Sequence, residues 1–279
     1  MNAMINTNSI LFDTDSYKVS MWLQYPPNTK HVYSHVLSRG GVWSETLFFN
    51  LQSFQREVLS RPITQEEIDS ADEFWTTHGE PFNRAGWQYI LDTHKGYLPV
   101  EIRSIDEGSV VDTGTVLATI VNTDPNVPWL TTWLETPILR AVWYGTTVAT
   151  QSWEIKRVIK SYLEMSGDVA GLPFKLHDFG SRGVSSNESS VLGGMSHLIN
   201  FMGTDTAIGI MGAMKYYDAK LNATGFSIPA AEHSTVTSWG RGSEALAYAN
   251  MVNKFSKEGS IFAVVSDSYD IFNAVDNIW

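Results

Sequence analysis

The stretch FKLHDFGSRG (174–183) decides the fold prediction, because a short strand pattern runs directly into a dense polar cluster. Two later stretches repeat the arrangement, FSIPAAEHST (226–235) and IFAVVSDSYD (261–270). Helical spacing of apolar residues separates or follows these strands, over about 187–201, 205–218, 243–257 and 270–279. Strands and helices that alternate in this way predict parallel strands joined by crossover helices, which is an α/β fold.

The residues before Pro128 have a more mixed pattern. The stretch HVYSHVLSR (31–39) is rich in β-forming residues and predicts a strand. Residues 65–78 begin with an acidic turn and continue with helical spacing, which predicts a short helix. Over 97–125, short β-branched runs alternate with turns, as is typical of an antiparallel β-unit. The N-terminal half is therefore expected to mix strands and helices.

Helical spacing resumes after Pro128, and Pro137 is the expected position of a kink or break. A second helix is predicted over 150–165, with Gly167 as its stop. At 279 residues the chain is long enough for about two domains. Its 43% hydrophobic and 18% charged residues are an ordinary globular balance.

The composition disfavours several classes of protein. The formal net charge is −11 and no dense Lys or Arg run occurs, which argues against nucleic-acid binding. The chain has no cysteine, hence no disulfide, thiolate metal site or cysteine nucleophile, and this fits a reducing compartment. No apolar stretch reaches the roughly 18–20 residues of a membrane span, and the N-terminus lacks a secretion signal. We expect a cytoplasmic protein that binds neither nucleic acid nor membrane.

Polar side chains gather where the three predicted strands end. If the strands are parallel neighbours, one mouth of the fold collects His177, Asp178, Arg182, Glu232, His233, Ser266, Asp267 and Asp270. A simpler interpretation exists for each element, since a Thr or Asp before a helix, such as Thr204 or Asp205, is commonly an N-cap. The co-occurrence at three strand ends favours a site for a charged substrate, without naming the reaction.

The residue types indicate the kind of substrate. Guanidinium groups bind phosphate in a bidentate manner, which makes Arg39 and Arg182 candidate anion ligands. Carboxylates that share an ion with substrate phosphates suit Mg²⁺, and Asp267 and Asp270 are the candidates. Three aromatic side chains are suited to stacking on a flat ring: Tyr17, Phe179 and Tyr269. No P-loop or dinucleotide-binding glycine pattern occurs.

At these residues the chain closely resembles the nicotinamide phosphoribosyltransferases. The shared stretches keep their order and cover nearly the whole chain; they include DTDSYKVS (13–20), LPVEIRSIDEG (98–108), KLHDFGSRGVSS (175–186), NFMGTDT (200–206), SIPAAEHST (227–235) and VVSDSYDI (264–271). The resemblance implies transfer of phosphoribose from 5-phosphoribosyl 1-pyrophosphate to nicotinamide, giving nicotinamide mononucleotide and pyrophosphate in NAD salvage. It also implies Mg²⁺ held with the substrate phosphates, ATP as co-substrate, and a homodimer with shared active sites.

The fold that the resemblance implies has two parts. Residues 1–149 are expected to form an N-terminal mixed α/β domain with the antiparallel β-unit and a dimer-contact segment. Residues 150–279 are expected to form the first part of an irregular α/β barrel of the nicotinate/nicotinamide phosphoribosyltransferase type, which carries the pyridine-binding residues. Family members are longer, and their segment for the ribose and its 5-phosphate has no counterpart here. We therefore expect an incomplete barrel, and a separate C-terminal polypeptide is one partner to consider.

The resemblance also assigns roles to side chains. His233 matches the histidine that ATP phosphorylates, and Asp267 matches the carboxylate that orients it. Phe179 matches one of the two rings that sandwich nicotinamide, and Tyr17 matches the other, which is supplied by the partner subunit. Asp205 matches the carboxylate that accepts a hydrogen bond from the carboxamide and would repel nicotinate.

Four further positions are implied to bind substrate. Arg182 and Ser227 match residues of the pyridine pocket, and Asp15 and Arg39 match residues that reach the partner's site. Two other functions stay open. One is nicotinate phosphoribosyltransferase, which shares the chemistry and is discriminated by Asp205. The other is a non-catalytic truncated fragment or subunit that needs a separate C-terminal half.

Overall fold

The computed structural model describes residues 8–279, which form two compact units divided between Gly225 and Phe226. The domain boundary expected between residues 149 and 150 falls inside a continuous helix of the first unit, α5 (Glu135–Ser166). The division into an N-terminal domain and a barrel therefore stays a prediction, whereas the mixed α/β class is confirmed by the elements below.

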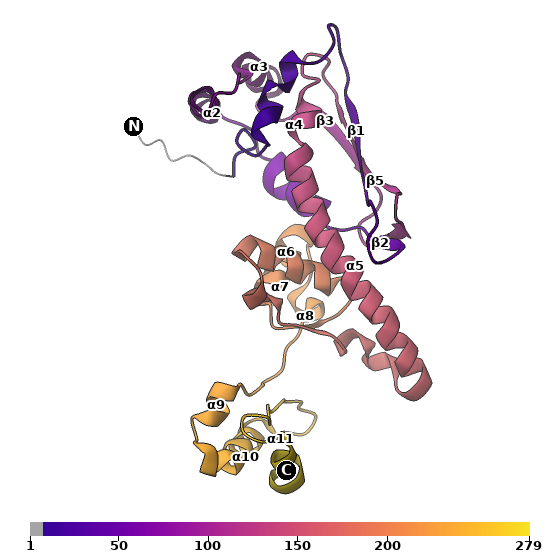
Figure 1. Cartoon of the computed structure of the whole chain (residues 1–279), viewed down its shortest axis with the longest axis vertical. Helices are drawn as coiled ribbons and strands as arrows, with labels where there is room; N and C mark the ends of the chain where they lie inside the picture. The colour runs from indigo at the N-terminus through magenta and orange to yellow at the C-terminus, as the bar shows by residue number, and fades with distance from the viewer. Residues whose placement is uncertain (1–7) are drawn as a thin grey trace. The chain divides into compact units, whose positions relative to one another are not determined.

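A three-stranded antiparallel sheet in the order β1-β5-β3 forms the N-terminal part of the first unit (Figure 1). Its strands are β1 (Tyr33–Leu37), β3 (Val100–Ser104) and β5 (Val116–Asn122). A second antiparallel pair joins β2 (Glu45–Leu47) to β4 (Val110–Asp112). The β-unit predicted over 97–125 and the strand predicted within 31–39 are confirmed. Strand β2 is not predicted from the sequence, because its three residues are too few to show an alternating pattern.

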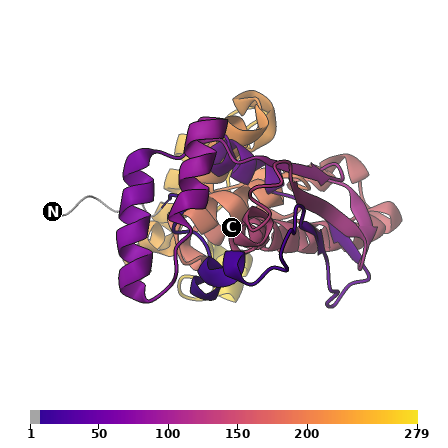
Figure 2. The same cartoon turned by 90° about the horizontal axis from the view of Figure 1, so that it is seen from above.

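Short helices cover this sheet region: η1 (Ser16–Leu23), α1 (Leu51–Phe54), η2 (Gln55–Leu59), α2 (Gln65–His78), α3 (Arg84–His94) and α4 (Leu130–Trp133). Helix α2 matches its prediction, and a capping box of Thr64 and Glu67 fixes its first turn. Figure 2 shows α2 and α3 lying side by side.

Four tryptophans dominate the core of the N-terminal part. The ring of Trp87 meets those of Trp129 and Trp133 edge to face, with centroids 5.0 and 5.1 Å apart. The indole N–H groups of Trp75 and Trp133 donate to the backbone oxygens of residues 11 and 10, at 2.8 and 2.7 Å. These two hydrogen bonds hold residues 10 and 11, near the start of the described chain, against the core.

Helix α5 has 32 residues and corrects two expectations. The expected break lies at Leu134, between α4 and α5, and Pro137 falls in the first turn of α5, where no backbone N–H is required. The helix predicted separately over 150–165 is the second half of the same helix. Within residues 8–279, no helix combines the length and apolar composition that a membrane crossing requires.

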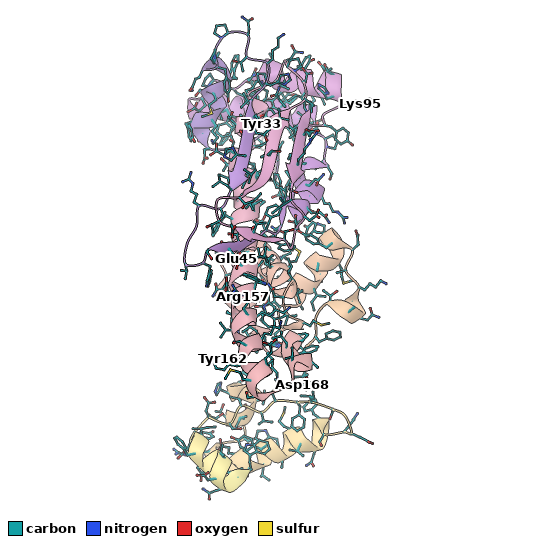
Figure 3. All side chains as sticks on the ribbon, turned by 90° about the vertical axis from the view of Figure 1, so that its right-hand side faces the viewer. Tyr33, Glu45, Lys95, Arg157, Tyr162 and Asp168 are labelled. Atoms are coloured by element: carbon teal, nitrogen blue, oxygen red, sulfur yellow. The ribbon has the colours of Figure 1, made fainter. Side chains whose placement is uncertain are left out.

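Tertiary contacts explain why α5 continues through the β-branched run around residue 147. The Thr146 and Thr150 hydroxyls accept hydrogen bonds from the backbone N–H groups of Phe49 (3.2 Å) and Leu47 (2.9 Å). Figure 3 shows Glu45 of β2 beside Arg157 of α5, and these side chains form an ion pair of 3.2 Å. One face of α5 therefore accepts hydrogen bonds from the backbone at and just after β2. This packing outweighs the weak helix propensity of the β-branched residues around position 147.

The rest of the first unit alternates strand and helix, as predicted. Its elements are η3 (Val169–Phe174), β6 (His177–Asp178), η4 (Gly180–Gly183), α6 (Asn187–Leu198), β7 (Gly203–Thr204), α7 (Ala207–Tyr217) and α8 (Leu221–Thr224). Strands β6 and β7 are parallel, with α6 as the crossover helix. A Cβ added at Gly194 would lie 2.8 Å from the Cα of Gly209, so α6 and α7 approach each other only because both positions are glycine.

The second unit contains α9 (His233–Thr237), η5 (Arg241–Ser243), α10 (Glu244–Phe255), α11 (Ile271–Asn273) and η6 (Ala274–Ile278). Val236, Ala247, Tyr248 and Ala274 form its core. The helix predicted over 243–257 is confirmed. The strands predicted over 226–230 and 261–268 meet in one parallel bridge, Ala230 with Ala263. The parallel direction is as expected, and the pairing is shorter.

A half-buried carboxylate in the N-terminal part gives a testable pH dependence. Asp124 accepts hydrogen bonds from Asn126 N–H (2.8 Å), Tyr89 OH (2.9 Å) and His94 Nε2 (2.8 Å). The Asn126 N–H, followed by the His94 and Tyr89 side chains, lowers the pKa of Asp124 to about 2. Because this folded pKa lies below the ordinary value, the stabilisation is present above about pH 4 and is lost as the pH falls towards 2.

Asp124→Asn is expected to lower the free energy of unfolding at pH 7 by about 1–3 kcal/mol. It should also flatten the pH dependence of that free energy between about pH 2 and 4. Urea denaturation followed by circular dichroism measures both effects. Asp92→Asn changes an exposed carboxylate on α3 and serves as the control. An Asp124→Asn protein that keeps the parent's acid-side slope would contradict the assignment.

Candidate functional site

The parallel pair β6–β7 brings His177, which the sequence placed at a strand end, together with Asp205 and Phe179. His177 lies on β6, and its Nε2 donates to Oδ1 of Asp205, just beyond β7, at 3.0 Å. The imidazole also contacts the ring of Phe179, with centroids 4.7 Å apart. The backbone N–H of Asp205 donates to the carbonyl of Asp178 at 2.9 Å, which ties the two strand ends together. An aromatic ring and a carboxylate therefore flank one imidazole.

The N-cap interpretation of Asp205 is not what the structure shows. The N-cap residue of α7 is Thr206, and its backbone N–H donates to the Thr204 hydroxyl at 2.9 Å. The Asp205 side chain accepts a hydrogen bond from His177.

A cavity of about 300 Å³ adjoins this group, and Phe179, His177 and Asp178 form part of its wall. Phe179 is 60% exposed, so its ring is accessible for stacking. Behind the strands, His197 is buried and donates from Nε2 to the Gly203 carbonyl at 3.0 Å. Burial lowers the pKa of His197, which favours its neutral form. The Thr206 hydroxyl lines the same cavity, and it is buried without a hydrogen-bond partner among the described residues.

The second unit carries its own histidine–carboxylate pair. His233, the first residue of α9, donates from Nε2 to Oδ1 of Asp267 at 2.9 Å. Both side chains are more than half exposed, at 58% and 61%. With Nε2 protonated, the lone pair of the imidazole lies on Nδ1. The hydrogen bond joins the two residues that the resemblance pairs, and their roles stay a prediction.

The carboxylates suggested as Mg²⁺ ligands are engaged elsewhere. Asp267 pairs with His233, and Asp270 accepts from the Asn273 N–H at 3.1 Å as the N-cap of α11. Across residues 8–279, no three His, Asp or Glu side chains are grouped so that they could hold a metal ion.

The residues expected to reach a partner's site lie at the start of the first unit. Asp15 accepts from the Thr136 hydroxyl at 2.5 Å, and Tyr17 in η1 is 58% exposed. Ion pairs of Lys18 with Glu135 and of Arg140 with Asp13 hold the same segment against α5. This segment is thus rigidly attached to α5 and presents the Tyr17 ring outward. Its place in a dimer stays a prediction.

The other predicted ligands are exposed, and their roles are untested by the geometry. Arg39 follows β1, Arg182 lies in η4, and Ser227 opens the second unit. The sequence-based prediction did not assign a role to His177, although the motif contains it. The sequence feature that could have indicated a role for His177 is its place at the end of a predicted strand, two residues before Phe179.

Comparison with known families agrees with this architecture. Residues 9–102 match the family described as "Nicotinamide phosphoribosyltransferase, N-terminal domain". Residues 174–279 match the "Nicotinate phosphoribosyltransferase (NAPRTase) family". The second match contains both histidine–carboxylate pairs.

Curated relatives cover almost the whole chain. A nicotinamide phosphoribosyltransferase of Xanthomonas campestris pv. campestris is 51% identical over 98% of this chain and 58% of its own length. The nicotinamide phosphoribosyltransferase of Acinetobacter baylyi is 29% identical over 94% of this chain and 55% of its own length. The chain thus spans somewhat more than half the length of these relatives.

Solved structures share the fold. Human nicotinic acid phosphoribosyltransferase superposes with a TM-score of 0.55 at 21% identity, over 81% of this chain and 40% of that one. Nicotinate-nucleotide pyrophosphorylase of Pyrococcus furiosus gives 0.57 at 14% identity, over 98% and 55%. Residues 174–279 match the nicotinate phosphoribosyltransferase family, and the solved structures share the fold. Over 98% of its length the chain is similar to a nicotinamide phosphoribosyltransferase.

Proposed function

We propose that this chain carries the pyridine-binding and histidine-bearing part of a nicotinamide phosphoribosyltransferase. In the proposed reaction the ring nitrogen of nicotinamide forms a bond to C1 of the ribose in 5-phosphoribosyl 1-pyrophosphate. The bond from C1 to the pyrophosphate oxygen breaks, and the products are nicotinamide mononucleotide and pyrophosphate. The observation that carries this proposal is the exposed Phe179 ring held beside the Asp205 carboxylate by His177.

The two side chains match the two parts of nicotinamide. A flat pyridine ring stacks on the Phe179 face, with Tyr17 of a second copy as the proposed opposite face. The carboxamide donates an N–H to Asp205, whereas the carboxylate of nicotinate has no N–H and is repelled. Arg182 and Ser227 are proposed to complete the pyridine pocket, and Asp15 and Arg39 to serve the partner's site, with Arg39 on phosphate.

ATP is the proposed co-substrate, and His233 its acceptor. The Nδ1 lone pair attacks the γ-phosphorus, an N–P bond forms, and the bond to the leaving oxygen of ADP breaks. Asp267 holds the imidazole through Nε2 at 2.9 Å and stabilises the positive charge that develops. Water then hydrolyses the phosphohistidine to phosphate, which returns His233 to its starting state.

The remaining assignments follow from the same proposal. Charge at ribose C1 becomes oxocarbenium-like as pyrophosphate leaves, so groups that stabilise the leaving phosphates matter more than activation of the ring nitrogen. Mg²⁺ is proposed to bind through the substrate phosphates rather than in a site made by this chain's side chains. We also propose a homodimer that acts in the cytoplasm.

Nicotinate phosphoribosyl transfer is the second candidate, and the name of the family matched by residues 174–279 favours it. The chemistry at C1 is the same for both pyridines. The position of the Asp205 carboxylate beside His177 and Phe179 argues for the amide, because a like charge next to the ligand disfavours an anionic ligand.

A product assay distinguishes these functions. The purified protein is incubated with 5-phosphoribosyl 1-pyrophosphate, Mg²⁺ and ATP, with either nicotinamide or nicotinate, and both mononucleotides are measured by chromatography. Faster formation of nicotinamide mononucleotide supports the proposal, and faster formation of nicotinate mononucleotide supports the second candidate. If neither forms, transfer by this chain alone is refuted, and if neither forms when a C-terminal complement is also supplied, the proposed function is refuted. Native mass spectrometry of the same preparation then shows whether it contains a separate C-terminal polypeptide.

A further inference from the structure

We propose that His177 is a positioning residue that sets the preference of Asp205 for a carboxamide over a carboxylate, and that protonation of His177 weakens this preference. The inference rests on the proposed function, since it concerns how the same site selects its pyridine. His177 contacts both partners of the ligand, because it hydrogen-bonds Asp205 at 3.0 Å and packs on Phe179 at 4.7 Å. A shift of this one imidazole therefore moves the carboxylate and the stacking ring relative to each other.

The backbone is shaped to seat this imidazole. Residue 203 is paired with His177 across β6 and β7, and it is a glycine. A Cβ at Gly203 would lie only 2.8 Å from His177 Nδ1, with the next atom, the Leu176 carbonyl oxygen, at 3.5 Å. The absence of a side chain at Gly203 thus makes room for the ring. A side chain at position 203 would therefore displace the ring whose Nε2 donates to Asp205.

The charge of the pair decides the selectivity. With a neutral imidazole, the Asp205 carboxylate keeps its full negative charge and repels an anionic ligand. With an imidazolium, the pair is neutral overall and the repulsion weakens. Because imidazole side chains change charge between about pH 5 and 8, the discrimination against nicotinate should fall as the pH is lowered in that range.

Other titratable groups surround His177, and they do not give the same response. Asp205 faces it from the start of α7, Asp178 lies next to it on β6, His197 faces it from α6, and Tyr144 lies across the cavity on α5. Burial lowers the pKa of His197 and raises that of Tyr144, which favours the neutral form of both.

Three variants separate the contributions of the ring. His177→Gln keeps an amide donor towards Asp205 but cannot become cationic. His177→Phe keeps an aromatic ring against Phe179 but removes the donor. Gly203→Ala removes no polar group and displaces the imidazole by contact with Nδ1. The matched control is His35→Gln, an exposed histidine of β1.

The measurement is the ratio of kcat/KM for nicotinamide to that for nicotinate, from pH 5.5 to 8.5. The wild-type and His35→Gln ratios should fall as the pH is lowered, whereas the His177→Gln ratio should stay flat. His177→Phe and Gly203→Ala should lower the nicotinamide kcat/KM by about tenfold at pH 8, with a smaller change for nicotinate. Circular dichroism spectra that match the wild type establish that each variant folds.

Two outcomes overturn the inference in distinguishable ways. If the wild type makes nicotinamide mononucleotide and His177→Gln keeps the wild-type pH profile, the positioning role of His177 is refuted and the proposed function stands. If the wild type turns over neither pyridine, the proposed function fails and this inference falls with it.

Discussion

Replacing His233 with glutamine is expected to abolish covalent labelling of the protein by ATP that carries a radioactive γ-phosphate. In the wild type the label should be acid-labile and alkali-stable, as expected for a phosphohistidine. Labelling should fall by at least about a hundredfold in the variant, because glutamine has no lone pair that can attack phosphorus. Stimulation of mononucleotide formation by ATP should disappear with it, whereas turnover without ATP should be retained.

The pairing with Asp267 makes this prediction specific. Asp267→Asn keeps the size of the orienting side chain but removes its negative charge, so labelling should be slowed rather than lost. His35→Gln leaves the pair untouched and should label like the wild type. Full labelling of His233→Gln would show that another residue accepts the phosphate. ATP stimulation that persisted in an unlabelled variant would separate the stimulation from the phosphohistidine.

Replacing Asp205 with asparagine is expected to change which pyridine is used. The variant loses a charged hydrogen-bond acceptor, so kcat/KM for nicotinamide should fall by about tenfold to a hundredfold. It also loses the negative charge that repels nicotinate, so kcat/KM for nicotinate should rise. Competition between the two pyridines in one reaction, with both mononucleotides quantified, gives the ratio directly.

A surface carboxylate provides the control for Asp205. Asp218 ends α7 and pairs with Arg56 at 2.9 Å, on an exposed part of the first unit. Asp218→Asn changes the net charge by the same amount and should leave the ratio unchanged. An Asp205→Asn protein with the parent's ratio would contradict the role given to this carboxylate, even if overall activity fell.

Local signals in the sequence were sufficient for several elements. Residues 65–78 carry an acidic first turn and an apolar stripe, and they form α2 with the predicted bounds. The strand pattern at 174–179 and the helical spacing over about 187–201 predicted β6 and α6, whereas the two-residue strand β7 was not predicted. In these segments the propensity, the turn residues and the tertiary fold favour the same state.

Contacts between distant segments explain what the sequence left out. The β-branched run around residue 147 gives no sign that α5 is continuous, because the Thr146 and Thr150 hydroxyls find their donors on residues 49 and 47. The site shows the same limit. The motifs predicted that His177, Phe179 and Asp205 share a region, but the hydrogen bond from His177 to Asp205 joins residues 28 positions apart.

The docking of β2 on α5 has a consequence for how the site can be altered. The backbone N–H groups of Leu47 and Phe49 fix the rotation of α5 about its own axis. Gln151 and Ile155, on the same helix, line the cavity beside Phe179. A substitution in β2 that rotates α5 would therefore move Gln151 and Ile155 in the cavity wall, although no proposed ligand-binding side chain is changed. Directed evolution of this protein for new pyridines should therefore yield mutations in the three residues of β2 as well as near Phe179.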